Sequence, residues 1–161
     1  MANESELPSY VAWLRERVGH DKVILTSAAA CIRDERGRVL LQKRRDNGLW
    51  GFPGGLQELG ETIAETARRE TYEEVGLKVE VKRLIGIYTT PDLDKRHANG
   101  DEAQVFIAFF ECETTGGALQ AQASEVLDIG WFDLNALPPM QACCALKAAD
   151  ARRFTGTAYF H

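Results

Sequence analysis

A run without glycine or proline, from Glu61 to Val75, is the strongest structural signal in this chain. Gly60 stands directly before the run and Gly76 directly after it. Most residues between them are good helix formers, and glycines at these positions are typical of an entry turn and a C-terminal stop. The run therefore predicts an α-helix near the middle of the chain.

The predicted helix has two different faces. At about 100° per residue, Glu70, Glu73 and Glu74 fall within an arc of about 100°. A neighbouring stripe holds small and apolar residues, namely Ala64, Ala67, Thr71 and Val75. We expect this stripe to pack on a β-sheet. Carboxylates three or four positions apart repel one another, and a hard cation relieves that repulsion. The acidic stripe indicates either a divalent metal site or a solvated helix face.

The wider segment from Gly55 to Leu77 resembles the Nudix box, Gly-x5-Glu-x7-Arg-Glu-U-x-Glu-Glu-x-Gly-U, in which U is a bulky aliphatic residue. The matching positions are Gly55, Glu61, Arg69, Glu70, Glu73, Glu74, Gly76 and Leu77. Thr71 departs from the pattern, because an aliphatic residue is usual there. This departure lies on the packing stripe, so it concerns packing more than chemistry.

The resemblance implies an α/β fold of the Nudix type, an α-β-α sandwich with a mixed sheet and the acidic helix packed on it. The order of elements agrees, because apolar β-rich segments precede and follow the central helix. Further helices are expected at about 9–18 and 141–153. The segments 23–32 and 39–43 predict a β-hairpin. Since no linker or repeat interrupts the chain, residues 1–161 are interpreted as a single domain.

The same resemblance implies a set of metal ligands. Glu70 and Glu74 are the strongest candidates, and Glu73 is a third ligand or shares the site through water. The carbonyl of Gly54, directly before the first box glycine, is expected to join them. We expect Mg²⁺, with Mn²⁺ as the alternative, because both take carboxylate and water oxygens.

Hydrolysis also needs a carboxylate that accepts the proton of the attacking water. Nudix enzymes differ in where this base lies. The candidates are Glu70 inside the box and Glu125 outside it, followed by Asp101 and Glu102. The candidate catalytic set also includes Glu73 and Arg69; Arg69 lies four residues before Glu73 and can hold it in one orientation.

Three residues near the glycine turn are candidates for substrate binding. Phosphates need cations and N–H donors, and Arg44 precedes the turn. Gly55 lets the backbone come close to a ligand, and Trp50 is a candidate for the pocket wall. Solvated surface charge is the alternative role for Arg44, and core packing is the alternative role for Trp50.

These observations predict metal-dependent hydrolysis of a phosphoanhydride bond in a nucleoside diphosphate linked to another group, with water attacking phosphorus. A narrower alternative is an ADP-ribose or nucleotide-sugar pyrophosphatase. A non-catalytic nucleotide-binding Nudix module is a second alternative, against which the intact box argues. An isopentenyl diphosphate isomerase is a third, but no cysteine is placed by a motif for that reaction.

The resemblance implies a small-molecule nucleotide or nucleotide-sugar substrate as the partner. The net charge of −5 argues against nucleic-acid polymers and membrane surfaces, and no apolar stretch near the N-terminus could span a bilayer. The four cysteines show no CxxC spacing, so free thiols in a reducing cytoplasm are expected. The apolar residues of the N-terminal helix make a homodimer a further hypothesis.

Overall fold

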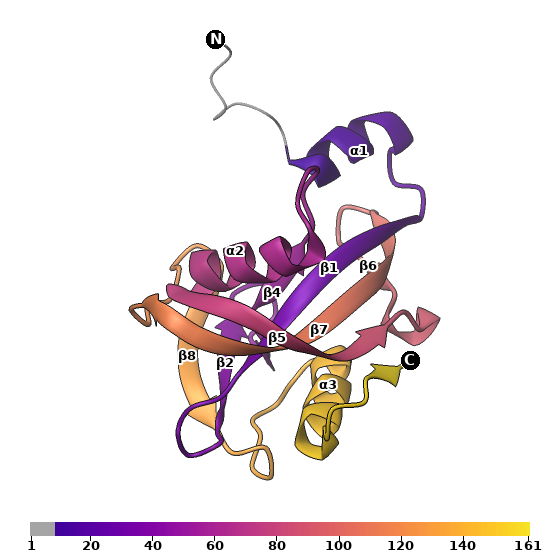
Figure 1. Ribbon diagram of the computed structural model, residues 1–161. Coiled ribbons are helices and arrows are strands. Elements are labelled where there is room, and N and C mark those ends of the chain that lie inside the picture. Colours follow the sequence, from indigo (N-terminus) through magenta and orange to yellow (C-terminus); the bar gives the residue numbers. More distant parts are fainter. Residues whose placement is uncertain (1–8) are drawn as a thin grey trace.

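The computed structural model describes residues 9–161, which form β-strands covered by helices (Figure 1). The elements along the chain are α1 (Tyr10–Val18), β1 (Val23–Ile32), β2 (Val39–Arg44), β3 (Trp50–Gly51), β4 (Gly54–Leu56), α2 (Ile63–Val75), β5 (Leu77–Tyr88), the 3-10 helix η2 (Pro91–Leu93), β6 (Lys95–Arg96), β7 (Glu102–Gly117), β8 (Val126–Phe132), α3 (Ala142–Arg153) and β9 (Tyr159–Phe160). Helices α1 and α3 each begin within one residue of the expected ranges. Across residues 9–161, no helix combines the length and the apolar character needed to cross a membrane.

The strands form two sheets. The larger sheet has the order β4-β1-β7-β5-β9, with β6 also paired to β7, and the smaller sheet has the order β3-β2-β8. Strands β1 and β7 run parallel from the pair Val23–Ala103 to the pair Ile32–Cys112. Strands β5 and β7 run antiparallel. The larger sheet is therefore mixed, as predicted.

The predicted hairpin between β1 and β2 is wrong. Strand β1 pairs with β4 on one edge and with β7 on the other, so neither edge is free for β2. The chain crosses to the smaller sheet through residues 33–38, and β2 pairs there with β3 and β8. Only an isolated bridge between Arg33 and Val39 lies at the expected turn. Two apolar segments around a polar turn identify strands, but they do not identify the partners of those strands.

Strand β1 separates two hydrophobic cores because its side chains alternate between the two faces of the sheet. Ala28 and Ala30 lie in the same cluster as Ala67 of α2, whereas Ala29 lies in the same cluster as Ala148 of α3. Alanine has no side chain beyond Cβ, so α2 can lie close to β1. Figure 1 shows α2 on one face of the sheet and α3 on the other, which confirms the predicted α-β-α sandwich.

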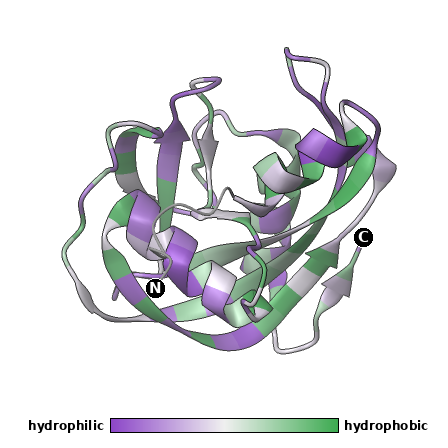
Figure 2. Ribbon diagram, turned by 90° about the horizontal axis from the view of Figure 1, so that it is seen from above, coloured by the Kyte–Doolittle hydropathy of each residue, from purple (hydrophilic) through white to green (hydrophobic). Residues whose placement is uncertain are grey.

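The acidic helix α2 packs on the sheet through the predicted stripe. Thr71 is fully buried, and its hydroxyl donates a hydrogen bond of 2.7 Å to the carbonyl of Ala67. Figure 2 looks onto the outer surface of α2, which is largely hydrophilic, while the strands beneath carry many apolar residues. The departure of Thr71 from the box pattern is thus accommodated by a hydrogen bond within the helix.

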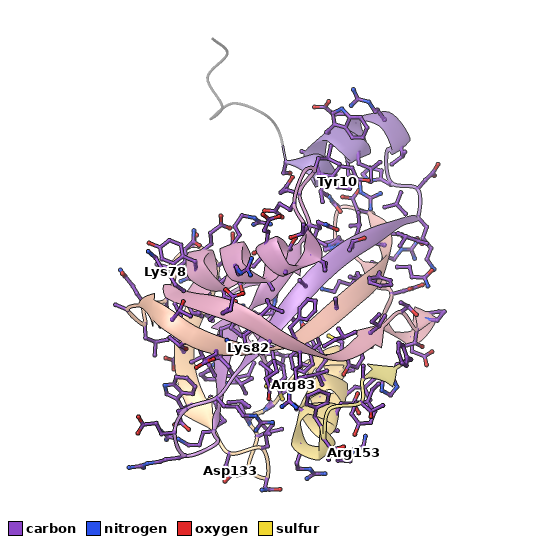
Figure 3. All side chains as sticks on the ribbon, in the orientation of Figure 1. Tyr10, Lys78, Lys82, Arg83, Asp133 and Arg153 are labelled. Atoms are coloured by element: carbon purple, nitrogen blue, oxygen red, sulfur yellow. The ribbon has the colours of Figure 1, made fainter. Side chains whose placement is uncertain are left out.

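Helix α1 lies beside the N-terminal end of β1, apart from the centre of the sandwich (Figure 1). None of its residues is fully buried. Tyr10, labelled in Figure 3, donates its backbone N–H to the Glu58 carboxylate at 2.7 Å. Arg15 donates to the Glu102 carbonyl at 2.8 Å. Polar contacts to the loop at Glu58 and to the start of β7 therefore contribute to holding α1 in place.

Candidate active site

The acidic helix α2 is fixed at both ends by local hydrogen bonds. Its N-cap is Thr62, whose hydroxyl accepts from the Glu65 N–H at 3.2 Å while the Glu65 carboxylate accepts from the Thr62 N–H at 2.7 Å. This reciprocal pair is a capping box. At the other end, Gly76 adopts a φ of 76° and donates its N–H to the Tyr72 carbonyl at 2.9 Å. The two caps define the ends of the helix that carries the box carboxylates.

Glu74 lies on the buried face of α2, with only 4% of its surface exposed. Its Oε2 atom accepts a hydrogen bond of 2.8 Å from the backbone N–H of Gly54. Burial raises the pKa of Glu74 to about 7, an effect that the Gly54 N–H and the Gln42 side chain oppose and the charge of Glu70 reinforces. Gln42 is also buried, and its Oε1 atom has no hydrogen-bond partner in residues 9–161.

Glu70 approaches the glycine turn from the same helix. A Cβ atom at Gly55 would stand 2.4 Å from the carboxyl carbon of Glu70, so this contact requires glycine. Burial raises the pKa of Glu70; Arg69 opposes this effect, while the charges of Glu73 and Glu125 reinforce it. The Glu70 carboxylate is thus held directly over the backbone of β4.

Gly54 allows β4 to lie close to β1. Its φ is +154°, and a Cβ atom there would stand 2.2 Å from the carbonyl oxygen of Ala28. In the antiparallel register, Gly54 lies opposite Ala29 and Gly55 opposite Ala28. The two glycines therefore let β4 lie close to β1 and to α2, where the Gly54 N–H reaches the Glu74 carboxylate at 2.8 Å.

Arg69 holds several box residues together. Its guanidinium donates to Glu61 at 2.5 Å, to Glu70 at 2.9 Å, to Glu73 at 3.0 Å and to the Leu56 carbonyl at 2.9 Å. The hydrogen bond to Glu61 and then the charge of Glu70 raise the pKa of Arg69, against the effect of burial, and keep it charged. A planar guanidinium can serve several acceptors at once, which an ammonium group cannot do in the same geometry. The expected contact between Arg69 and Glu73 is present.

Glu73 lies at the surface, whereas Glu70 and Glu74 lie at the glycine turn. The Glu73 side chain is 50% exposed and contacts Arg69. In the part of the chain that the structure describes, no three His, Cys, Asp or Glu side chains are placed to hold a metal ion together. The assignment of Glu73 as a third ligand therefore remains a prediction.

The chemistry of Glu70 and Glu74 fits a divalent cation. Both carboxyl groups are desolvated, and burial raises the pKa of each. A cation at this position would favour the ionised form of both groups and relieve the repulsion between them. Carboxylate and backbone carbonyl oxygens are also donors that Mg²⁺ and Mn²⁺ accept.

The candidate bases outside the box lie in different surroundings. Glu125 is exposed, and its charge acts on Glu70. Asp101 accepts a hydrogen bond of 2.7 Å from His20 if that ring nitrogen is protonated, and Glu102 pairs with Arg96 at 2.7 Å. Of the three acids, Glu125 is the one whose charge contributes to the raised pKa of Glu70.

Of the other substrate-binding candidates, Arg44 lies near the turn and Trp50 packs beside it. Arg44 lines a cavity next to Gly54 and pairs with Asp46 at 2.8 Å. Trp50 meets Phe132 edge to face, with 4.7 Å between ring centroids, and does not line that cavity. The contact supports the packing alternative for Trp50.

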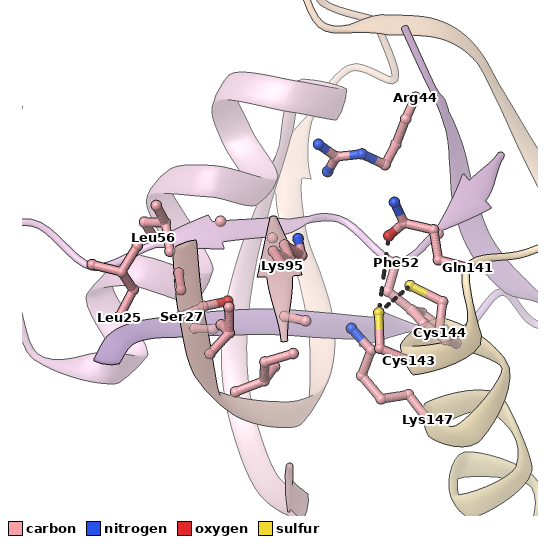
Figure 4. A pocket seen from close by; sticks show the side chains of 18 of the residues that line it. Leu25, Ser27, Arg44, Phe52, Leu56, Lys95, Gln141, Cys143, Cys144 and Lys147 are labelled. Carbon is pink, nitrogen blue, oxygen red and sulfur yellow. Dashed lines mark hydrogen bonds between the residues drawn. The ribbon is translucent and has the colours of Figure 1, made fainter. Parts of the chain in front are cut away.

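The cavity has a volume of about 210 Å³ and also borders Gly55 (Figure 4). Cys144 and Lys147 contribute to its wall from α3. Neither residue was predicted from the sequence to lie at the site. A signal was present, because Lys147 stands directly before Ala148 on a helix whose buried residues also include Cys144 and Ala151. A lysine on such a stripe indicates a cation directed inward.

Comparison with known proteins agrees with this geometry. Residues 24–153 match the family model described as the NUDIX domain. An ADP-ribose pyrophosphatase of Methanocaldococcus jannaschii is 34% identical over 138 residues, which cover 84% of this chain and 72% of the relative. A MutT-like protein of Streptomyces ambofaciens is 38% identical over 126 residues, which cover 78% of this chain and 75% of the relative.

A solved structure of similar fold is an ADP-ribose pyrophosphatase from Streptococcus suis. It superposes with a TM-score of 0.66 at 28% identity and covers 85% of this chain and 98% of its own. The family match spans most of this chain and contains the whole box from Gly55 to Leu77. The chain therefore belongs to the Nudix family.

Proposed function

We propose that this protein hydrolyses a phosphoanhydride bond in a nucleoside diphosphate linked to another group, with water attacking phosphorus. The observation that carries the proposal is the buried Glu74 carboxylate, which is held by the Gly54 N–H and lies within the field of Glu70. If Glu74 had only a structural role, its buried negative charge would have no counter-ion. In a cation-dependent hydrolase, the same charge binds the metal ion. Membership of the Nudix family supports the same reaction class.

We assign a divalent cation, Mg²⁺ with Mn²⁺ as the alternative, to Glu70 and Glu74, with Glu73 and the Gly54 carbonyl as further ligands. Such a cation, when bound, neutralises charge on the phosphates and lowers the pKa of a water molecule. Gly55 lets the backbone of β4 come close to a substrate. Glycine also leaves room for the Glu70 carboxylate, which a side chain at this position would meet.

The remaining residues position groups or move a proton. Arg69 orients Glu70 through its hydrogen bond of 2.9 Å. Either Glu70 or Glu125 accepts the proton of the attacking water. Arg44 provides a positive charge for a substrate phosphate, while Trp50 supports the turn that carries Gly54 through its contact with Phe132.

ADP-ribose is the narrower substrate to test first, because two similar proteins are described as ADP-ribose pyrophosphatases. Other nucleotide sugars, nucleoside triphosphates and dinucleoside polyphosphates belong in the same screen. Each is incubated with Mg²⁺ or Mn²⁺ in water enriched in ¹⁸O, and both products are identified by mass spectrometry. We expect metal-dependent cleavage with the label in a phosphate product. Nucleotide binding without turnover would instead favour a non-catalytic module.

Two further assignments concern the whole chain, which we take as a single domain. Its four cysteines are free thiols, which suits a reducing cytoplasm. Trp13 of α1 is 38% exposed, and no residue of that helix is fully buried, which suits a homodimer formed through this helix. Sedimentation at two protein concentrations, with Trp13→Ala as the comparison, tests the dimer.

A further inference from the structure

Of the residues that line the cavity beside the glycine turn, only Arg44, Gly54 and Gly55 have a role in the cleavage step proposed above. It lies between residues of β1 and β7 and the first turns of α3 (Figure 4). Because it adjoins the glycine turn, a part of the substrate near the cleaved linkage would enter it. The side chains that line the cavity would therefore contact the group that the substrate carries beside the cleaved linkage.

Lys147 is the unusual side chain in this cavity. Only 4% of its surface is exposed, and its ammonium group makes no hydrogen bond or ion pair with residues 9–161. The nitrogen lies 5.6 Å from the ring centroid of Phe109 and 6.0 Å from that of Phe52. Buried lysines are rare unless they are paired, and aromatic faces at these distances are weak partners for an ammonium group. The Lys147 nitrogen is not among the fully buried atoms that lack a hydrogen-bond partner, so it faces the open space of the cavity. A ligand with negative charge would supply the missing partner.

The rest of the cavity does not neutralise Lys147. Lys95 and Arg44 also line it, and Lys95 makes no ion pair within the described residues. Arg44 is paired with Asp46, but neither Asp nor Glu lines the cavity itself. In Figure 4 the three cationic side chains reach toward the same space from β2, β6 and α3.

Two thiols are the other ionisable groups near Lys147. The Sγ atoms of Cys143 and Cys144 lie 3.9 Å apart. The hydrogen bond from Cys143 lowers the pKa of Cys144; burial opposes this effect, and the charge of Lys147 reinforces it. A thiolate at Cys144 is thus the one competing counter-ion within the lining, and a variant without this thiol is needed to test its effect.

We propose that the cavity is an anion-selecting subsite, in which Lys147 and Lys95 hold a phosphate or carboxylate group carried by the substrate in addition to its diphosphate. The inference rests on the proposed function, because the cavity opens beside the glycine turn of that site. It favours nucleoside diphosphate derivatives with an extra anionic group over their neutral counterparts. A neutral group in the cavity would leave the Lys147 charge without a partner.

Matched substrate pairs test this inference. NADP⁺ against NAD⁺ and coenzyme A against its dephospho form differ by one phosphate, and UDP-glucuronate against UDP-glucose differs by one carboxylate. We expect kcat/KM to be at least tenfold higher for the anionic member of a pair that is hydrolysed. In Lys147→Met, the ratio within that pair should fall close to one. The phosphate and carboxylate pairs separately identify which anion is preferred.

The exposed Lys78, labelled in Figure 3 at the opposite end of the molecule from α3, provides the matched control. Lys78→Met removes the same charge and should keep the ratio of the wild type. Cys144→Ala tests the competing counter-ion: an unchanged preference supports the proposal, whereas loss of the preference contradicts it. If Lys147→Met does not fold, Lys147→Gln takes its place.

Binding of inorganic phosphate separates this inference from the proposed function. In buffer that contains a metal chelator, millimolar phosphate should raise the melting temperature of the wild type and of Lys78→Met. It should not raise the melting temperature of Lys147→Met. If no nucleotide is cleaved, the proposed function fails and the phosphate shift alone decides the subsite. If pairs are cleaved equally by the wild type, the subsite is overturned while the hydrolase assignment stands.

Discussion

The backbone N–H of Gly54 donates a hydrogen bond of 2.8 Å to the Oε2 atom of Glu74, which joins the glycine turn to the buried face of the acidic helix. The bond stabilises a carboxylate at a buried position, where the loss of hydration disfavours a charged group. Burial raises the pKa of Glu74 to about 7, although the Gly54 N–H favours the ionised form. One residue therefore serves both the packing of α2 on the sheet and the charge of the candidate metal site.

Glu74→Gln should abolish most turnover while the fold survives. The glutamine amide oxygen can still accept the hydrogen bond from Gly54, but it supplies no charge for a cation. We expect kcat to fall by about 100-fold or more, since even residues that only support metal ligands cost about 10–100-fold. Initial rates at saturating Mg²⁺, with circular dichroism as the folding control, provide the measurement. Activity close to that of the wild type would remove Glu74 from the ligand set.

The metal-free protein should lose stability as the pH rises from 5 to 8. The pKa of Glu74 is about 7 in the folded protein, compared with 4.5 for an unperturbed glutamate, so folding binds a proton. The stabilising contribution is complete below the unperturbed pKa of 4.5 and is lost as the pH rises through 7. The difference corresponds to about 3 kcal/mol. Urea unfolding in a chelator should show this decline in the wild type, and Glu74→Gln should show a smaller one. If the stability of both proteins fell equally with pH, Glu74 would not be the source of the pH dependence.

Gly55→Ala should reduce activity by displacing Glu70. The new Cβ atom would stand 2.4–2.6 Å from the three carboxyl atoms of Glu70, so that side chain must move. We expect kcat/KM to fall by about 10–100-fold, the range for disturbed support of a metal site. Gly116→Ala is the matched control, because its Cβ atom meets nothing within 4 Å. Equal kinetics in the two variants would show that Glu70 has room to adjust without loss of function.

Arg69→Lys should lower turnover even though it keeps the positive charge. Arg69 contacts Glu61, Glu70 and Glu73 together, and an ammonium group cannot reproduce that fork. We expect a loss of about 10–100-fold in kcat/KM. Arg68→Lys provides the control, since Arg68 makes one ion pair with Glu80 in a partly exposed setting. If the two variants behave alike in steady-state assays, Arg69 does not position the carboxylates.

Much of the sandwich could be predicted because its signals are local. The run 61–75 predicts a helix, and the structure places α2 at Ile63–Val75. The start shifted because Thr62 and Glu65 form a capping box, whose sequence signal lies inside the predicted run. The alternation of Ala28, Ala29 and Ala30 between two cores also follows from the strand period. Local periodicity therefore specified which residues face the helices.

Features that depend on distant segments could not be predicted in this way. The pairing of β1 with β7 joins residues about eighty positions apart, so the expected hairpin with β2 did not form. The helical wheel places Glu73 beside Glu70, but Arg69 holds it at the exposed side. Lys147 reaches the cavity only because α3 packs beneath the sheet. The stripe that Lys147 shares with Cys144 and Ala151 indicates that this lysine points inward, but it does not indicate which cavity the lysine meets.

Tyr88→Phe should destabilise the protein by about 1–3 kcal/mol, because it leaves a buried carboxylate with one donor fewer. Asp150 is fully buried and accepts from the Tyr88 hydroxyl at 2.7 Å, from His161 at 2.8 Å and from Arg153 at 2.9 Å. Tyr159→Phe is the control, since the Tyr159 hydroxyl makes an exposed bond of 3.2 Å to a backbone carbonyl. Urea unfolding of both variants measures the difference. A loss as large in Tyr159→Phe would show that the aromatic packing near β9, and not the buried Asp150, determines the effect.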